Sequence, residues 1–279
     1  MNLIKKFYFY LKSHGLSSTL KRSIRTSFFF IKKYIGYKDA ISRRIDFLDK
    51  KNLKLFDYTV RYGPFLGLKF SKESWWGIST SQLIGIYEKE VLDSLCELSG
   101  KYKNFINIGA ADGYYAIGVL KNNLFRKSFC YEISANGRKM IEKNSELNGV
   151  SDRISIKAEA ELDFYDDFSE TDLKDSVLFI DIEGAEFDLL TKDVLSAFKN
   201  SVIYIEIHDW FFEDGNQKFN DLRTRCDELF SVTTLTTTSR DVSVFPEFKE
   251  YNDNDRWLIC SEGRERLMTW YKLEPKFFK

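Results

Sequence analysis

The sequence predicts an α/β protein with a largely parallel sheet, and three observations lead to this fold class. Five short apolar runs recur through the middle of the chain, and segments with helical spacing of apolar residues separate most of them. The first run leads into a glycine turn, and the fourth and fifth runs end in acidic residues. The five predicted strands are 105–108, 129–131, 154–158, 177–183 and 202–207. In such sheets, ligands bind beyond the carboxyl ends of the strands.

The composition is typical of a soluble globular protein that buries a sizeable core. The chain has 279 residues, of which 43% are hydrophobic and 30% are charged, so we expect about one or two domains. The four cysteines are widely spaced and lie in apolar stretches: Cys96, Cys130, Cys226 and Cys260. This spacing fits neither a zinc site nor a disulfide framework, and it predicts buried free thiols in a reducing compartment.

Charge is unevenly distributed along the chain, although the formal net charge is zero. Residues 1–54 contain 14 basic and 3 acidic residues, a net charge of +11, and the remaining residues contain 28 basic and 39 acidic ones. We predict a basic helical N-terminal arm (1–54), a hairpin or lead-in segment (55–80) and a main domain (81–279). The favoured interpretation packs the arm on the main domain, and the alternative is peripheral contact with an anionic membrane. No nucleic-acid-binding motif accompanies the charge, so nucleic acid is not an expected partner.

The first residues of the chain do not read as a secretion signal. Lys5, Lys6 and Lys12 interrupt the apolar stretches before any of them reaches the length of a signal-peptide core. The sequence also lacks a run of about eighteen apolar residues, the length that a membrane-spanning helix needs. We therefore expect a cytoplasmic protein, with membrane association only through the N-terminal arm.

The stretch 104–113 predicts a strand, a glycine turn and the start of a helix. Gly109 and Gly113 let the backbone turn and approach a ligand, and N–H groups at the helix start can bind oxygens. Glu132 follows the second strand, where it can accept hydrogen bonds from ribose hydroxyls. Asp112 would repel a pyrophosphate but suits a cationic ligand, of which S-adenosylmethionine is the obvious one. The alternative is an ordinary turn without a ligand.

The segment before this turn contains a predicted hairpin and two adjacent tryptophans. The runs 55–60 and 66–70 alternate like strands, and a turn that contains glycine and proline joins them. Trp75 and Trp76 follow the hairpin. They either line a substrate pocket, because sugars stack on indoles, or cap the core.

Two helices are predicted beside the first two strands. Apolar residues at helical spacing predict a helix over 82–98, which would place Tyr87 and Glu88 over the cofactor. After the second strand, Ser134 is a candidate N-cap, and the asparagine and glycine at 148–149 are a stop signal.

Acidic residues and a histidine follow the two most apolar strands. Asp181 and Glu183 lie on one side of the fourth strand, and Gly184 opens the next turn. Glu206 and His208, one of two histidines in the chain, likewise share one side of the fifth strand. Carboxylates at the end of a buried strand are costly to desolvate, so their presence indicates an electrostatic or ligand-binding role.

The third strand and the C-terminal part carry weaker signals. Glu159 stands just past the third strand and either binds an adenine amino group or belongs to an acidic surface. A helix is predicted over 216–230, followed by an antiparallel strand pair, 231–238 and 257–260. The polar stretch 239–256 between them is predicted to be a loop that reaches towards the active face.

Several motifs together resemble a known family. They are 85–91 (Gly-Ile-Tyr-Glu-Lys-Glu-Val), 107–115 (Asn-Ile-Gly-Ala-Ala-Asp-Gly-Tyr-Tyr), 131–132 (Tyr-Glu), 180–186 (Ile-Asp-Ile-Glu-Gly-Ala-Glu) and 206–208 (Glu-Ile-His). On these residues the chain resembles the FkbM family of class I S-adenosylmethionine-dependent methyltransferases, over roughly residues 80–262. The resemblance implies a Rossmann-like seven-stranded sheet of order 3-2-1-4-5-7-6, with strand 7 antiparallel. The basic N-terminal arm lies outside the resemblance.

The same resemblance implies a cofactor site and an acceptor. The glycine turn would hold the methionine part of the cofactor, Glu132 the ribose hydroxyls, and Asp181 would sit beside the methyl donor. Relatives often carry Asn-x-Gly where this chain has Ala-Asp-Gly at 111–113. The family typically methylates oxygen atoms on glycans and related natural products, so the expected acceptor is a sugar hydroxyl of a glycan or glycolipid precursor. The expected cofactor-binding residues are Asn107, Gly109, Ala110, Asp112, Gly113, Glu132, Glu159, Asp181, Tyr87 and Glu88.

The chemistry of methyl transfer to oxygen suggests catalytic residues. An alcohol is a poor nucleophile until a base accepts its proton, and His208 is the candidate base because its ordinary pKa lies near neutrality. Asp181 or Glu183 could orient His208 or replace it. Alternatively, Asp181, Glu183 and His208 could bind a divalent metal ion, Mg²⁺ or Mn²⁺, that lowers the pKa of the hydroxyl. Aromatic faces of Tyr87, Tyr115 or the tryptophan pair could attract the sulfonium.

Other functions remain open at this stage. A non-catalytic methyltransferase-like scaffold in glycan assembly is one alternative, but a scaffold has no need of carboxylates at three strand ends. A nicotinamide-dependent oxidoreductase is another, and the acidic glycine turn counts against it. Within methyltransferases, a small-molecule or protein acceptor stays open because a fold does not fix its substrate.

Overall fold

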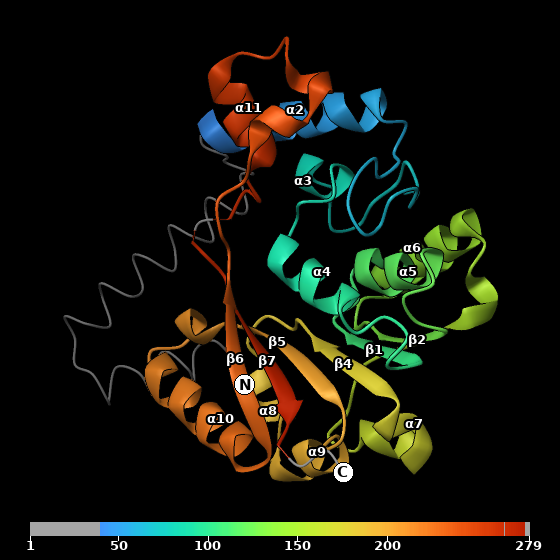
Figure 1. The fold of residues 1–279 in the computed structure, drawn as a ribbon, viewed down its shortest axis with the longest axis vertical. Helices are drawn as coiled ribbons and strands as arrows, with labels where there is room; N and C mark the ends of the chain where they lie inside the picture. Colours follow the sequence, from blue (N-terminus) through green and yellow to red (C-terminus); the bar gives the residue numbers. More distant parts are fainter. Residues whose placement is uncertain (1–39, 265, 277–279) are drawn as a thin grey trace, which may run out of the picture. The chain divides into compact units, whose positions relative to one another are not determined.

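The computed structural model describes residues 40–264 and 266–276 (Figure 1). The chain divides into two compact units, Met1–Phe47 and Leu48–Lys279. Of the first unit, only the beginning of helix α2 (Ala40–Leu55) is described, so residues 1–39 of the predicted basic arm lie outside the described residues. In the described part of the chain, no helix is both long and apolar enough to cross a membrane.

A seven-stranded sheet of order β3-β2-β1-β4-β5-β7-β6 forms the centre of the second unit (Figure 1). Strands β1 to β5 run parallel, and β7 is antiparallel to both of its neighbours, β5 and β6. This order and orientation confirm the predicted fold class. The strands are β1 (Asn104–Ile108), β2 (Lys127–Tyr131), β3 (Ile154–Lys157), β4 (Ser176–Ile180), β5 (Val202–Ile207), β6 (Phe230–Thr236) and β7 (Thr269–Pro275).

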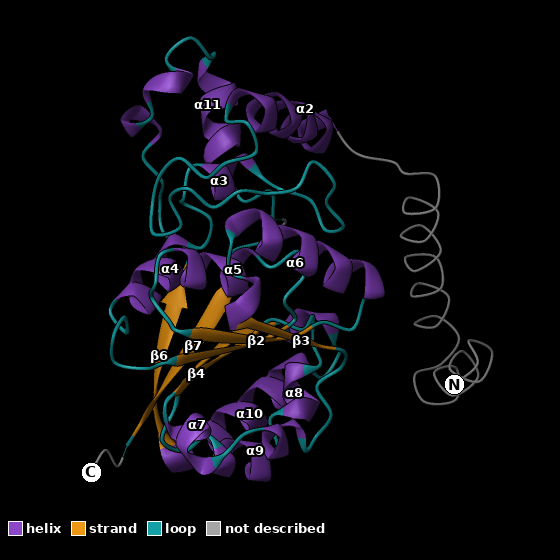
Figure 2. Cartoon of the chain, turned by 90° about the vertical axis from the view of Figure 1, so that its right-hand side faces the viewer, coloured by secondary structure: helices purple, strands orange, loops and turns teal. Residues whose placement is uncertain are grey.

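Helices cover both faces of the sheet, so the central strands are buried on both sides (Figure 2). Alternate side chains of β1 and β4 enter different cores: Phe105 and Phe179 enter one, and Ile106 and Leu178 enter the other. The first core is covered by α4 (Lys89–Cys96), α5 (Tyr114–Lys121) and α6 (Ala135–Asn148), and the second by α7 (Glu170–Lys174), α8 (Glu186–Leu189), α9 (Lys192–Ala197) and α10 (Gly215–Leu229).

Local capping explains where several helices begin and end. The Ser134 hydroxyl accepts a hydrogen bond from the Gly137 N–H at the start of α6, and Gly149 (φ +68°) ends that helix, as predicted.

All four cysteines are free thiols, and Cys96 is the least buried of them. Short 3₁₀ helices are η1 (Ser151–Arg153), η2 (Phe164–Asp167), η3 (Asp209–Phe211), η4 (Val242–Val244) and η5 (Pro246–Phe248).

The continuous helix predicted over 82–98 is wrong. The structure has α3 (Thr80–Leu83) and α4, separated by a turn in which Gly85 (φ +67°) and Glu88 (φ +47°) are left-handed. A Cβ on Gly85 would lie 2.1 Å from the carbonyl oxygen of Tyr62. A contact between distant segments therefore breaks the helix, and the break places Tyr87 and Glu88 in a turn.

The predicted hairpin is reduced to one antiparallel bridge, between Thr59 and Lys69. Leu55 is the last residue of α2 rather than the start of a strand. The N–H of Phe70 donates to the Tyr58 carbonyl at 2.8 Å, so the two segments still lie side by side.

The last predicted strand, 257–260, is also wrong, because these residues belong to helix α11 (Asp253–Cys260). The Asn252 side chain caps this helix by accepting the Asp255 N–H, and acidic residues in the first turn suit a helix N-terminus. The strand that pairs with β6 is instead β7, which follows the last segment that was predicted to be a strand. The predicted strand 231–238 corresponds to β6.

Candidate functional site

The glycine turn after β1 brings the ends of β1 and β4 together. A Cβ on Gly109 (φ +82°) would lie 1.7 Å from the carbonyl oxygen of Asp181, so only glycine fits there. Ala111 (φ +47°) is also left-handed, and Gly113 (φ +87°) is the N-cap of α5. The turn therefore places the start of α5 beside the residue that follows β4.

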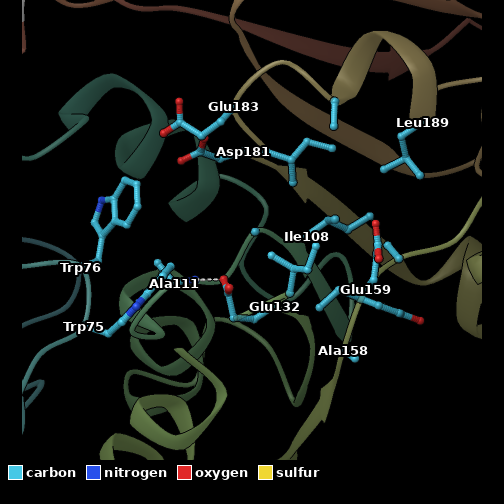
Figure 3. A pocket seen from close by; sticks show the side chains of 16 residues that line it. Trp75, Trp76, Ile108, Ala111, Glu132, Ala158, Glu159, Asp181, Glu183 and Leu189 are labelled. Atoms are coloured by element: carbon cyan, nitrogen blue, oxygen red, sulfur yellow. Dashed lines mark hydrogen bonds between the residues drawn. The ribbon is translucent and has the colours of Figure 1, made fainter. Parts of the chain in front are cut away.

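Glu132 follows β2 and is buried beneath this turn. One carboxylate oxygen (Oε2) accepts the Ala111 N–H at 2.8 Å (Figure 3). The other (Oε1) accepts the Ser134 N–H at 2.7 Å. Each carboxylate oxygen can accept a second hydrogen bond. The structure therefore fixes Glu132 in one orientation and leaves it able to bind hydroxyl groups.

A cavity of about 300 Å³ lies over Glu132, and we call it the Glu132 cavity. Figure 3 shows the two tryptophans on one side of it and Glu159 on the other. The structure thus brings together residues from the ends of β1, β2, β3 and β4. The lining residues are Trp75, Trp76, Ile108, Gly109, Ala111, Tyr131, Glu132, Ile133, Ala158, Glu159, Ala160, Asp181, Ile182, Glu183, Ala185 and Leu189.

We expected from the sequence that the Asp112 carboxylate would face a cationic ligand, but in the structure it bonds to the loop that carries the tryptophans. It accepts hydrogen bonds from the Ser74 hydroxyl and from the backbone N–H groups of Trp75 (3.1 Å) and Trp76 (3.3 Å). Asp112 therefore fixes the loop that carries the tryptophans. The two indoles are 39% and 62% exposed, so they line the cavity rather than cap the core.

A smaller cavity, of about 60 Å³, lies between the glycine turn and the loop before α4. Tyr115 lines it together with six predicted cofactor-binding residues: Tyr87, Asn107, Gly109, Ala110, Asp112 and Asp181. Glu88 lies behind these aromatic rings and accepts a hydrogen bond from the Tyr115 hydroxyl.

His208 is buried directly after β5, and Glu186 fixes it. The His208 backbone N–H donates to the Glu186 Oε1 atom at 2.8 Å, and the same oxygen lies 3.3 Å from the His208 Nδ1 atom. The other oxygen of Glu186 accepts the Gly184 N–H at 2.8 Å. Glu186 therefore ties the end of β5 to the turn after β4. It is the last acidic residue of the 180–186 motif, which was the signal that could have identified it.

The other nitrogen of His208 faces three carboxylates. Its Nε2 atom lies 3.4 Å from Glu206, 3.6 Å from Glu183 and 3.7 Å from Asp181. Burial would lower the pKa of His208, but hydrogen bonds and charge from Glu186 and Glu206 outweigh it and raise the pKa to about 10. At neutral pH the imidazole therefore holds its proton, so it cannot act as the free base that the sequence analysis expected.

Asp181 lies where the cavities meet. Its Oδ1 atom is itself buried and accepts no hydrogen bond from the described residues, although the residue as a whole is partly exposed. Burial, followed by the charge of Glu206, raises the pKa of Asp181 well above the ordinary value for a carboxyl group. Burial would also raise the pKa of Glu206, but the hydrogen bond with His208 and the charge of Arg264 lower it.

No signal in the sequence identified Arg264, which joins an acidic residue of the turn before α4 to one at the end of β5. Its guanidinium donates to Glu206, to Glu88 and, at 2.6 Å, to the Tyr87 hydroxyl oxygen. Burial and the charge of Glu206 nevertheless raise the pKa of Glu88 to about 8. Arg264 therefore links the turn before α4 to the end of β5 through hydrogen bonds to buried side chains.

A second cavity, of about 390 Å³, lies over His208, and we call it the His208 cavity. Trp76, Asp181 and Glu183 line both this cavity and the Glu132 cavity. Two ligands can therefore meet at Asp181, each in its own cavity. The lining residues are Trp76, Tyr87, Asp181, Glu183, Glu206, His208, Trp210, Phe211, Glu262, Arg264, Arg266 and Met268.

Comparison with known proteins gives one family match. A family model described as the methyltransferase FkbM domain matches residues 89–230. No curated protein matches the chain.

Three of the solved structures with a similar fold are methyltransferases or a methylase, all at low sequence identity. An O-methyltransferase from Bacillus cereus in complex with SAH is 14% identical, with a TM-score of 0.47, and the match covers 88% of this chain and 96% of that one. A putative tRNA (m1A22) methyltransferase from Streptococcus pneumoniae, in complex with S-adenosyl-L-methionine, is 15% identical, with a TM-score of 0.45 and coverage of 68% and 74%. A ribosomal protein L11 methylase from Lactobacillus delbrueckii subsp. bulgaricus is 12% identical, with a TM-score of 0.45 and coverage of 75% and 86%.

Proposed function

The chain belongs to the family of FkbM-domain methyltransferases, whose model matches 142 of its 279 residues, and we propose that it methylates a sugar hydroxyl with S-adenosylmethionine. The observation that carries this proposal is the meeting of two cavities at Asp181. The Glu132 cavity would hold the cofactor, and the His208 cavity would hold the acceptor. A hydroxyl group in the second cavity could then face a methyl group in the first.

The residues of the Glu132 cavity fit the cofactor. Glu132 keeps lone pairs for the ribose hydroxyls, and Glu159 stands where it could accept from the adenine amino group. Gly109 and Ala111 also line this cavity, so the backbone of the glycine turn would lie against the methionine part. Bound S-adenosylmethionine would supply a methyl group on a positively charged sulfur. Because Asp112 is occupied by the tryptophan loop, Asp181 and nearby aromatic faces would meet that charge.

We assign Asp181 as the proton acceptor. Asp181 lines both cavities and its Oδ1 atom accepts no hydrogen bond from the described residues, whereas His208, whose Nε2 atom lies 3.7 Å from that oxygen, holds its proton at neutral pH. A cation beside Asp181 would lower its raised pKa and favour the ionised form that can accept a proton. His208, fixed by Glu186, orients Asp181 and Glu183 and stabilises their charge. Holding the hydroxyl in line with the methyl group supplies much of the remaining rate enhancement.

A divalent metal ion is the alternative way to activate the hydroxyl. Ligand atoms of Asp181, Glu206 and His208 lie within 4.8 Å of one another, whereas the expected set contained Glu183 in place of Glu206. Arg264 already bonds to Glu206, so this cluster has a cation in place, and a metal ion fits it less well. The proposed mechanism therefore has no step that requires a metal ion.

A sugar acceptor is supported by the aromatic lining of the His208 cavity. Trp76 and Phe211 are 62% and 55% exposed, and Trp210 lies beside them. Exposed aromatic faces stack on the apolar face of a sugar ring, and a small number of polar groups can then select a hydroxyl. A small-molecule or protein acceptor, or a non-catalytic scaffold, is the alternative. Contact of the basic arm with an anionic membrane remains a prediction.

The test is calorimetric titration of the purified protein with S-adenosylhomocysteine, with NADH as the control ligand. We expect micromolar binding of S-adenosylhomocysteine alone. Glu132→Ala should abolish this binding, Glu132→Gln should weaken it, and Glu142→Ala, an exposed glutamate on α6, should not change it. If the folded protein binds neither ligand, the proposal is wrong and the scaffold interpretation takes its place.

A further inference from the structure

A third cavity, of about 520 Å³, adjoins the His208 cavity, and we call it the Trp257 cavity. The two cavities share three lining residues, Glu262, Arg264 and Arg266. The shared residues lie on the segment that connects α11 to β7. This segment follows the residues that the FkbM family model matches, so its side chains lie outside the matched domain.

Three arginines line the Trp257 cavity, and acidic residues neutralise two of them. Arg240 forms ion pairs with Glu90 at 2.7 Å and with Glu262 at 3.0 Å. Arg264 pairs with Glu88 and Glu206. These two guanidiniums are committed to the structure, so they are not available to a ligand.

Arg266 differs from the other two arginines, because it has no acidic partner among the described residues. Its guanidinium lies over the indole of Trp210, whose ring centre is 4.7 Å from the guanidinium carbon. Trp210 in turn lies 5.1 Å from His208, ring centre to ring centre. Arg266 is exposed and lines both cavities. A guanidinium with no acidic partner among the residues that the structure describes therefore lies over the face of Trp210, and Trp210 in turn lies beside His208.

We propose that the acceptor is an anionic sugar, and that Arg266 binds its carboxylate or phosphate while Trp210 supports the ring. This inference rests on the proposed function and names the class of its acceptor. A guanidinium binds planar carboxylates and phosphates through paired hydrogen bonds, which a neutral sugar cannot offer. The acids of the His208 cavity do not oppose this arrangement: Arg264 pairs with Glu206 and Glu262, and His208 faces Asp181 and Glu183. The anionic group of the sugar lies at the Arg266 end of the cavity, and the reacting hydroxyl lies at the Asp181 end.

The test is saturation-transfer NMR on the full chain saturated with S-adenosylhomocysteine. The probes are two matched pairs, glucose with glucuronate and galactose with galacturonate, together with glucose 1-phosphate and glucose 6-phosphate. We expect a signal at least several-fold stronger from an anionic probe than from its neutral partner, and a weaker signal as salt is added. The carboxylate and phosphate probes separate the two sources of the charge.

Variants of two arginines assign the effect. Arg266→Gln should remove the preference for the anionic probe, and Arg266→Lys should retain part of it. Arg126→Gln is the matched control, since Arg126 is also exposed and precedes β2 at the opposite end of the strands. Equal signals within both pairs, no signal from any anionic probe, or an unchanged preference in Arg266→Gln would each overturn the inference. Binding of S-adenosylhomocysteine, measured in the same samples, tests the proposed function separately: its loss would refute the proposed function, and its retention with no anionic preference would refute this inference alone.

Discussion

The Glu132 cavity and the His208 cavity meet at Asp181, but the chain builds them in different ways. The first is formed mostly by short motifs at the ends of β1 to β4, and nearly all of its lining lies within residues 89–230. The second collects Trp76 and Tyr87 from before that range, and Glu262, Arg264, Arg266 and Met268 from after it. The proposed cofactor side lies almost entirely within the residues that the family model matches, and the proposed acceptor side also needs the segments that flank this match.

The largest effect should come from Asp181, one of the three residues that line both cavities. Asp181→Asn removes the proposed proton acceptor and keeps its shape, so methyl transfer should fall about 10²–10⁴-fold. Binding of S-adenosylhomocysteine should change much less. The measurement is incorporation of labelled methyl groups into the acceptor, with calorimetry in parallel. Asp188→Asn, whose side chain on α8 is 83% exposed, is the matched control. Full activity in Asp181→Asn would show that Asp181 is not the proton acceptor, and Glu183 or His208 would then be the candidates.

Two glycine variants should separate loss of cofactor affinity from loss of stability: Gly109→Ala is expected to show both, and the control, Gly149→Ala, only the second. Gly109→Ala and Gly149→Ala both place a Cβ in a left-handed conformation, which costs about 1–2 kcal/mol. Only at Gly109 does the Cβ also collide with the Asp181 carbonyl oxygen, whereas at Gly149 no atom lies within 4 Å. We therefore expect both variants to melt at lower temperature, but only Gly109→Ala to lose affinity for S-adenosylhomocysteine, by about tenfold or more. Equal affinities in the two variants would show that the turn does not touch the cofactor.

The contrast between short local motifs and contacts of distant segments also explains which features the sequence could predict. The five parallel strands and Glu132 were predictable, because each depends on a pattern of a few neighbouring residues or on a short motif. The break between α3 and α4 was not, because it depends on Gly85 contacting Tyr62, and neither was the position of β7. Arg264 lies 58 positions after Glu206 and 176 after Glu88, so no local pattern could have joined them. Asp112 was noticed for its charge, but its role depends on a loop 36 to 38 positions away.

The smallest effect should follow removal of divalent metal ions. EDTA is expected to leave methyl transfer unchanged, because the guanidinium of Arg264 already supplies positive charge to Glu206 and the protonated imidazole of His208 supplies it to Asp181. The measurement is incorporation of labelled methyl groups with EDTA and after readdition of Mg²⁺ or Mn²⁺.

A variant sharpens this prediction, because Arg264→Gln removes the cation that occupies the cluster. If Arg264 takes the place of a metal ion, then Mn²⁺ should bind more strongly to Arg264→Gln than to the unsubstituted protein, since Glu206 loses its ion pair. Loss of activity in EDTA, restored by Mg²⁺ or Mn²⁺ in the unsubstituted protein, would contradict this argument. The acceptor hydroxyl would then be activated by a metal ion held by Asp181, Glu206 and His208, and the role of Arg264 would be to orient Glu206 as a ligand.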